Sequence, residues 1–217
     1  TTEIYTLSLH DALPILVCAN GKIMGTRNIF NKKIFTAESM AKDIRFLLVN
    51  FPKIAAAMRD KKVTRAFNEK IMMVTTAVNG CIYCAWFHAK QAVESGISEE
   101  EVRKLLNLQF QADATGFEAM ALLYAQHFAE TDRNPDPAMT KKLFDFYGEQ
   151  TANQIILFIR MIYFGNLYGN TWDAVLSRFR GVSVPNSKFV FELVFFLLNV
   201  PIMFPAMVIM KFDKRKV

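Results

Sequence analysis

Apolar residues recur at helical spacing through most of the chain. Between Val63 and Val78 they follow one another at steps of three or four residues, which is the period of an amphipathic helix packed on a core. No segment alternates between apolar and polar residues for long enough to predict a sheet. The pattern predicts an all-α fold, with helices over residues 36–51, 54–58, 63–78, 81–95, 98–108, 116–130, 155–168 and on to about 181.

Glycine and proline set the predicted helix ends. Pro52 disfavours helix at the residue before it, so we expect the first helix to stop there. Asn79-Gly80 and Gly96 predict helix ends, because glycine readily takes the left-handed conformation that closes a helix. Asp136 and Pro137 suit the cap and first residue of a further helix.

The helices form one predicted domain over residues 36–181, since 217 residues are enough for one good-sized core. An irregular lead-in over residues 16–35 precedes it, and Gly181–Ser187 is the one convincing linker. A hydrophobic tail with a basic end occupies residues 182–217. Residues 1–15 look like a translated sequencing-library adapter, so we expect them to be an artefact that stands where the natural N-terminus is missing.

The tail has the length and composition of a membrane segment. A straight helix over residues 189–210 would reach roughly 33 Å, enough to span a bilayer, and Lys211, Lys214, Arg215 and Lys216 follow it. Glu192 is costly in lipid, and Pro201 and Pro205 are expected to break or kink the helix. Three interpretations stay open: a membrane-embedded or interfacial anchor, an arm packed on its own domain or a sister subunit, and a re-entrant or aggregation-prone end.

Composition and charge narrow the possible partners. Apolar residues make up 52% of the chain, with 20 Phe and 11 Met, which indicates a surface buried in a partner or a membrane. The formal net charge is +6, and the basic residues are scattered through the predicted helices and gathered at the C-terminal end. This distribution lacks the basic stripe of nucleic-acid-binding proteins, so we expect no nucleic-acid partner.

The residues that carry chemistry gather around one short stretch. Cys81, Cys84 and His88 stand at spacings that put all three on one side of a helix, and Glu69 precedes them. The helix end predicted at Asn79-Gly80 places both cysteines in the first turn of the next helix, where free N–H groups and the helix dipole favour a thiolate. Taken alone, Glu69 fits a solvated surface residue, because it stands off the apolar stripe of its helix.

The remaining cysteine and histidines are weaker candidates. The chain has 3 cysteines, too few for a disulfide-stapled secreted scaffold, and a lone CxxC indicates redox or metal chemistry in a reducing compartment such as the cytoplasm. Cys18 has no histidine or cysteine at ligand spacing, and His127 fits a half-buried helix residue. His10 belongs to the expected artefact.

The constellation allows two kinds of site. In the first, the cysteines are a dithiol that cycles through a disulfide, with His88 as the base for the attacking thiol and Glu69 orienting the imidazole. In the second, Cys81, Cys84, His88 and Glu69 are four ligands of a zinc ion. Structural zinc usually draws two pairs from separate hairpins, whereas three of these four share one helix. An incidental grouping is the third possibility, and we expect no bound cofactor.

The pattern Glu-x11-Cys-x2-Cys-x3-His resembles the active-site signature of the alkylhydroperoxidase D (AhpD)-like branch of the carboxymuconolactone decarboxylase family. The resemblance extends over about Ser39 to Arg178 and includes Asn-Gly before Cys-x-Tyr-Cys and the later Gly-Ile-Ser-Glu-Glu-Glu. It implies an AhpD-like helical bundle that forms a homo-oligomer, with thiol peroxidase activity. The implied partners are a hydroperoxide substrate and a thiol/disulfide reductant protein. The tail lies outside the resemblance.

Carried over by position, the resemblance implies that Cys84 attacks the peroxide and that Cys81 resolves the sulfenic acid to a Cys81–Cys84 disulfide. It implies a proton relay of His88 and Glu69. Tyr83 stands where well-studied members carry a histidine, a departure that bears on peroxidase turnover more than on the redox centre. The decarboxylase branch lacks the cysteine pair, so lactone decarboxylation is not favoured. The alternative from another class is a non-catalytic, membrane-associated assembly protein, held at a membrane surface by residues 189–210.

Overall fold

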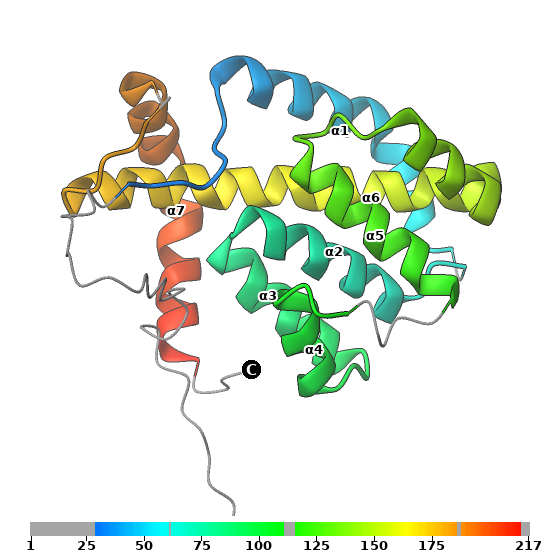
Figure 1. Cartoon of the computed structure of the whole chain (residues 1–217). Helices are drawn as coiled ribbons and strands as arrows, with labels where there is room; N and C mark the ends of the chain where they lie inside the picture. Colours follow the sequence, from blue (N-terminus) through cyan, green and yellow to red (C-terminus); the bar gives the residue numbers. More distant parts are fainter. Residues whose placement is uncertain (1–28, 61, 111–115, 186–187, 214–217) are drawn as a thin grey trace, which may run out of the picture.

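The computed structural model describes residues 29–60, 62–110, 116–185 and 188–213. Among these residues the secondary structure is helical, apart from an isolated bridge between Ile29 and Ser183, which confirms the all-α prediction. The helices are α1 (Ala37–Ala57), α2 (Arg65–Asn79), α3 (Ile82–Glu94), α4 (Glu99–Leu106), α5 (Gly116–Glu130), α6 (Pro137–Phe179) and α7 (Phe189–Phe212) (Figure 1).

Helix α2 lies in the middle of the bundle and contacts α3, α4, α5 and α6 (Figure 1). Its predicted apolar stripe is buried, as Phe67, Ile71 and Val74 illustrate. A second face of α2 is buried too, and it carries Met73 and Glu69. Glu69 is only 8% exposed, so it is not the surface residue that its place off the stripe suggested. The reason is tertiary: neighbouring helices enclose α2 on several sides.

The helix ends predicted from glycine and aspartate are confirmed. Gly80 closes α2 with φ at +68°, and Gly96 follows α3 with φ at +95°. Asp136 caps α6, where its Oδ1 accepts a hydrogen bond from the Ala138 N–H at 2.6 Å. Within α6, Gly148 has φ 72° and ψ 167°, a conformation open almost only to glycine. Gly148 therefore divides α6 into two helical parts, and the second part is continuous to Phe179.

Pro52 lies inside α1, so the predicted stop before it is wrong. Proline removes the N–H that would bond the carbonyl four residues earlier, here that of Leu48. Leu48 and Pro52 are both exposed, so water can satisfy this carbonyl. Ile54 and Ala57 are buried beyond the proline. Their packing holds the last turns of α1 in helical form, because tertiary contacts supply most of a helix's stability.

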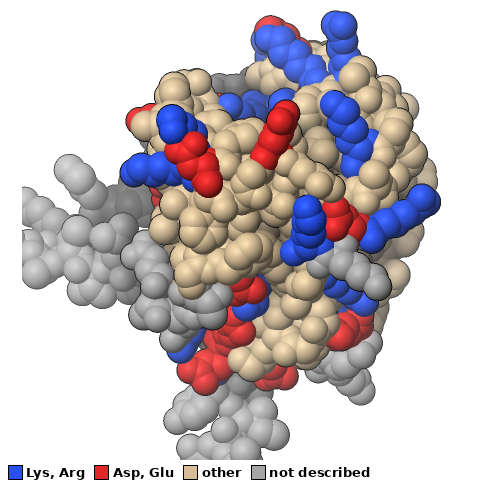
Figure 2. Space-filling view, turned by 90° about the vertical axis from the view of Figure 1, so that its right-hand side faces the viewer, with Lys and Arg blue, Asp and Glu red and all other residues tan. Residues whose placement is uncertain are grey.

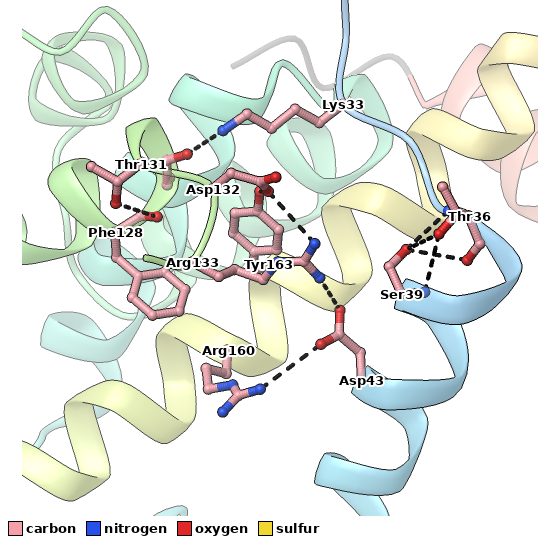
Figure 3. A network of polar contacts seen from close by, with 11 residues as sticks. Lys33, Thr36, Ser39, Asp43, Phe128, Thr131, Asp132, Arg133, Arg160 and Tyr163 are labelled. Carbon is pink, nitrogen blue, oxygen red and sulfur yellow. Dashed lines mark hydrogen bonds and ion pairs between the residues drawn. The ribbon is translucent and has the colours of Figure 1, made fainter. Parts of the chain in front are cut away.

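A network of polar side chains ties α1 to the turn between α5 and α6 (Figure 3). Asp43 of α1 accepts a hydrogen bond from Arg133 at 2.6 Å and lies 3.9 Å from the Arg160 guanidinium. Asp132 accepts a hydrogen bond from the Tyr163 hydroxyl at 2.6 Å. Asp132 and Arg133 both have positive φ, at 51° and 69°. The paired charges therefore hold this turn against α1 and α6.

Charges elsewhere on the described surface are mixed in sign. On the face that Figure 2 shows, Lys and Arg side chains stand among Asp and Glu rather than in a single stripe. Pairs one helical turn apart include Lys42 with Glu38 at 2.6 Å and Lys141 with Asp145 at 2.5 Å. Such exposed pairs contribute little to stability.

Helix α7 continues through Pro201 and Pro205, so the break expected at these prolines is absent. The two prolines leave the carbonyls of Leu197 and Pro201 without a helical partner. Both of these residues lie on the exposed side of the helix, where the lost hydrogen bonds do not open the packed side. The helix therefore continues past both prolines while its other side packs on the domain.

One face of α7 packs on the C-terminal part of α6. The Trp172 and Phe196 rings stack at 4.1 Å, and Phe195 is buried beside them. Glu192 is fully buried, and its Oε2 accepts a hydrogen bond from the Arg178 Nε at 2.9 Å. The interpretation of the tail as an arm packed on its own domain therefore holds for this face. The pairing lowers the cost that Glu192 would have in an unpaired apolar setting, although its Oε1 is buried without a hydrogen-bond partner among the described residues.

The opposite face of α7 is apolar and exposed. By length and composition, α7 is the one described helix that is long and apolar enough to cross a membrane. The membrane and partner interpretations concern this outer face, which we define by its exposed apolar residues Val190, Val194, Leu197, Leu198, Ile202, Phe204, Val208, Ile209 and Phe212.

The first residues of the segment expected as a linker contact both the lead-in and α6. The Phe30 N–H donates a hydrogen bond to the Ser183 carbonyl at 2.8 Å, and Val184 is buried with Phe30 and Ala174. The described part of the lead-in, residues 29–35, therefore passes along the end of α6 and contacts the segment that connects α6 to α7. Residues 1–15, with the expected artefact, and Cys18 lie outside the described residues.

Candidate active site

The cysteine pair lies at the start of α3, as its spacing predicted. Cys81 is the N-cap, and its Sγ accepts a hydrogen bond from the Cys84 N–H at 3.3 Å. The left-handed Gly80 turns the chain sharply between α2 and α3, so that both cysteines fall in the first turn. Both are free thiols, and their sulfurs lie 2.7 Å apart. The pair is therefore placed for direct exchange of a proton or formation of a disulfide.

The two thiols differ in pKa. Burial alone raises the pKa of Cys81, but hydrogen bonds from the Cys84 thiol and from the amides of Cys84 and Tyr83, with the charge of Lys32, lower it below its ordinary value. The pKa of Cys84 is raised, first by its hydrogen bond to Cys81, then by burial and by the negative charge on Cys81. Such a pair titrates as a unit. Its first proton leaves an anion on Cys81 and a proton on Cys84.

Access and charge favour different sulfurs. Cys81 is 1% exposed and buried against α6, whereas Cys84 is partly exposed. A substrate therefore reaches Cys84 first, although Cys81 is the thiol whose pKa is lowered. The role of Cys84 as attacking thiol stays a prediction, and the geometry adds that Cys81 stands within reach of its proton.

Glu69 and His88 meet across the α2–α3 contact. The Nδ1 of His88 lies 2.7 Å from Oε2 of Glu69, and both side chains are largely buried. His88 is one turn after Cys84 on the same helix, and the side chains of both line one cavity. Among the described residues, no hydrogen bond joins His88 to either cysteine. The four predicted residues therefore form two contacting pairs, Cys81–Cys84 and Glu69–His88, side by side at one corner.

The cavity has a volume of about 350 Å³ and is almost entirely apolar in its walls. Cys84 and His88 are among its lining residues, and α2, α3, α6 and α7 each supply a wall. Ligand pockets commonly have 300–1,000 Å³. The sequence did not predict that the tail helix takes part: Met203, Ala206 and Met210 of α7 close one side. The other apolar wall residues are Met72, Tyr83, Trp86, Phe87, Met161, Ile162 and Tyr168.

Two further residues near Cys81 escaped the sequence analysis. Gly169 of α6 faces the sulfur so closely that a Cβ built there would lie 2.7 Å from Cys81 Sγ. Lys32, in the segment before α1, forms an ion pair with Asp173 at 2.8 Å and lowers the pKa of Cys81. Both are far from the CxxC in sequence, so no spacing rule connects them to it. The one sequence signal for this close approach was Gly169 itself, a glycine within a predicted apolar helix.

The zinc interpretation needs Cys81, Cys84, His88 and Glu69 to converge on one point. In the part of the chain that the structure describes, no three His, Cys, Asp or Glu side chains are arranged to hold a metal ion. His127 is half-buried on α5 as predicted, and its Nε2 accepts a hydrogen bond from the Asp136 N–H at 3.0 Å. It therefore fixes the start of α6 rather than serving the site.

Residues 48–127 match the model of the carboxymuconolactone decarboxylase family. This segment of the chain is therefore similar to that family. The family includes the AhpD-like proteins, and both enzymes of the decarboxylase kind and peroxidases occur in it. A search of curated proteins finds no match to the chain. The matched range holds α2, α3 and α4 with all four candidate site residues, whereas α7 lies beyond it.

Proposed function

We propose that the chain is a thiol-dependent peroxidase and disulfide oxidoreductase that reduces organic hydroperoxides through Cys81 and Cys84. The observation that carries this proposal is the free thiol pair at a helix start, with Cys84 and the Glu69-bound His88 opening into one apolar cavity. A cavity of this kind takes the organic part of a hydroperoxide and holds its polar end at the sulfur and imidazole.

In the first step, Cys84 attacks the terminal oxygen of the hydroperoxide. Cys81, the thiolate of the pair, takes the Cys84 proton across the 2.7 Å contact as the S–O bond forms. The O–O bond breaks, and the leaving alkoxide accepts a proton from the His88 imidazolium to give an alcohol. Glu69 holds the imidazole by its Nδ1 and stabilises its charged form. The products are a Cys84 sulfenic acid, the Cys81 thiol and the alcohol.

In the second step, Cys81 attacks the sulfur of the sulfenic acid. The S–S bond forms as the S–O bond breaks, and the thiol proton joins the leaving hydroxide to give water. Peroxide has then received two electrons from the two thiols. A reductant protein with its own dithiol returns these electrons by thiol–disulfide exchange. The three-residue spacing at the helix start lets the disulfide close without a large backbone movement.

Stopped-flow mixing of the reduced protein with cumene hydroperoxide tests this function. We expect one equivalent of peroxide to be consumed as a Cys81–Cys84 disulfide forms, detected by mass spectrometry. Cys84→Ser should abolish consumption. Cys81→Ser removes the proton acceptor of the first step, so it should slow consumption and leave a Cys84 sulfenic acid that dimedone traps. Cys18→Ser, which removes the remaining cysteine, is the matched control and should react as the unmodified chain does. Neither consumption nor disulfide would show that the proposal is wrong.

A further inference from the structure

Helix α7 is a wall of the redox cavity and also carries the outer face, an exposed apolar surface. A helix that only docks on its own domain needs one apolar face. The inner face of α7 meets that need through contacts such as the Trp172 Nε1–H to Met207 Sδ hydrogen bond at 3.1 Å. The fold of the described chain does not use the outer face. A contiguous surface of nine exposed apolar side chains marks an interaction site.

The charges on α7 indicate what covers the outer face. The acidic residue within α7 and the one that follows it both pair with the domain. Glu192 pairs with Arg178, and Asp213 pairs with Lys90 at 3.0 Å. Lys188 and Lys211 at the two ends of the helix are exposed, and more basic residues follow in the sequence. The outer face has no acidic residue of its own and has exposed lysines at both ends, with exposed Glu38 of α1 near Lys188. An apolar face with this charge pattern complements an anionic bilayer surface.

The same contacts determine how α7 meets the bilayer. A spanning helix would lose the Glu192–Arg178 pair and the Tyr168 hydroxyl to Asn199 hydrogen bond, leaving polar groups unpaired in lipid. A helix that lies in the interface keeps its inner face on protein and buries only the outer face. The geometry is therefore that of an interfacial helix.

We propose that α7 lies on an anionic membrane and that the cavity takes the hydroperoxidised acyl chain of a bilayer lipid. This inference rests on the proposed function. Met203, Ala206 and Met210 line the cavity, while Phe204 and Ile209, in the same turns of α7, are exposed on the outer face. The lipid phase and the cavity are thus separated by one helix. The volume of about 350 Å³ suits an acyl segment that carries the hydroperoxide rather than a whole lipid.

The chemistry matches the site on both sides of the reacting bond. Methionine and aromatic walls favour a hydrocarbon chain, which they remove from water. Cys84 attacks the terminal oxygen, the O–O bond breaks, and the lipid alkoxide leaves as a hydroxylated acyl chain after protonation by His88. The two electrons come from Cys81 and Cys84, as in the steps above, and a dithiol protein restores them.

The test uses the reduced full chain and vesicles of phosphatidylcholine with phosphatidylglycerol that contain hydroperoxidised linoleoyl chains. Flotation measures binding, and mass spectrometry measures conversion of hydroperoxide to hydroxide. We expect binding to anionic vesicles that weakens when salt is raised from 0.05 to 0.5 M, and weak binding to neutral vesicles. Leu198→Asp with Ile202→Asp should abolish flotation and lower lipid turnover relative to cumene hydroperoxide turnover at least tenfold.

Leu48→Asp is the matched control, because Leu48 of α1 is as exposed (70%) as Leu198 (73%) but lies on another helix. It should change neither flotation nor turnover. Ala206→Trp narrows the cavity from its α7 wall, so lipid turnover should fall while flotation is kept.

Consumption of cumene hydroperoxide without flotation or lipid conversion would overturn this inference alone. No reaction with either peroxide would overturn the proposed function. Flotation without lipid conversion would overturn the substrate assignment, and a smaller sedimenting mass of the α7 double variant, with no flotation of the parent, would show that a second copy covers α7.

Discussion

Gly169→Ala tests whether the tight contact between α6 and Cys81 sets the charge state of the thiol pair. The added Cβ would lie 2.7 Å from Cys81 Sγ and 3.2 Å from a ring carbon of Tyr83. Ordinary carbon contacts are about 3.5–4.0 Å, so the sulfur has to retreat by roughly 1 Å. Overpacking of this kind costs about 1–3 kcal/mol, and alanine returns about 1 kcal/mol through its helix propensity. The variant therefore still folds.

The retreat of Cys81 weakens its hydrogen bond with the Cys84 thiol, the strongest influence that lowers its pKa. A hydrogen bond to a charged group contributes about 1.5–3 kcal/mol. Because about 1.4 kcal/mol corresponds to a factor of ten, the thiolate fraction at neutral pH should fall about tenfold or more. Thiolate absorbance at 240 nm, followed during a pH titration of the reduced protein, measures this change.

We expect the first titration midpoint of Gly169→Ala to lie at higher pH than that of the unmodified chain. Gly165→Ala is the matched control, one turn earlier on α6, where a Cβ meets only Ile162 Cδ1 at 3.9 Å. Gly165 also borders the cavity, so this control is judged on thiol titration and not on turnover. An unchanged titration curve for Gly169→Ala, with Gly165→Ala also unchanged, would refute the argument that close packing at Cys81 tunes the pair.

Three further predictions concern the relay, the docking of α7 and the effect of pH. Glu69→Gln keeps a group of the same shape beside His88 but removes its charge, so kcat/KM for cumene hydroperoxide should fall about 100-fold in stopped-flow assays. Glu192→Ala should lower the free energy of unfolding by about 3 kcal/mol in urea, the lower end for a broken buried pair, because Arg178 keeps some access to water. Because the pKa of Cys81 is lowered in the folded state, ionisation of Cys81 stabilises the fold. This contribution is complete above the ordinary thiol pKa, and it is lost as pH falls through the folded-state pKa of Cys81. The raised pKa of Cys84 acts the other way, so stability of the reduced protein should fall above about pH 8.5.

The relay prediction has a control on the same chain, and each of the other two has a result that would contradict it. Glu94→Gln removes an exposed carboxylate of α3, and it should leave kcat/KM unchanged. For α7, a loss below about 0.5 kcal/mol in Glu192→Ala would mean that the ion pair does not hold the helix. For pH, urea unfolding of either Cys81→Ser or Cys84→Ser should show a weaker rise and a weaker fall than the parent, because each thiol shifts the pKa of the other. A pH profile that both variants share with the parent would assign the dependence to other groups.

Local spacing was enough to place the cysteines. Cys81, Cys84 and His88 share one helix, and the helix period alone brings them to one side. The helix caps at Gly80 and Asp136 could be predicted because a cap depends on a few neighbouring atoms. Pro52 shows the limit of such rules: it removes one hydrogen bond, but burial of Ile54 and Ala57 outweighs that loss.

Long-range packing decided the rest of the candidate site. Glu69 reads as a surface residue from its own helix, and only the packing of several helices around α2 buries it beside His88. Gly169 and Lys32 meet Cys81 because α6 and the lead-in pass next to α3 in space. No periodicity encodes these contacts, since each depends on how two distant segments are oriented.

The sequence by itself determined an all-α chain, a thiol pair at a helix start with a histidine one turn on, and an apolar tail with a basic end. These features follow from helical period, capping and composition, which act within a few residues or one helix. Only the tertiary structure decided that Glu69 is buried against His88, that Cys81 is the buried thiol, and that the tail walls the redox cavity. Burial, pKa and cavities arise where separate helices meet, and their effects depend on distances that the order of residues does not contain.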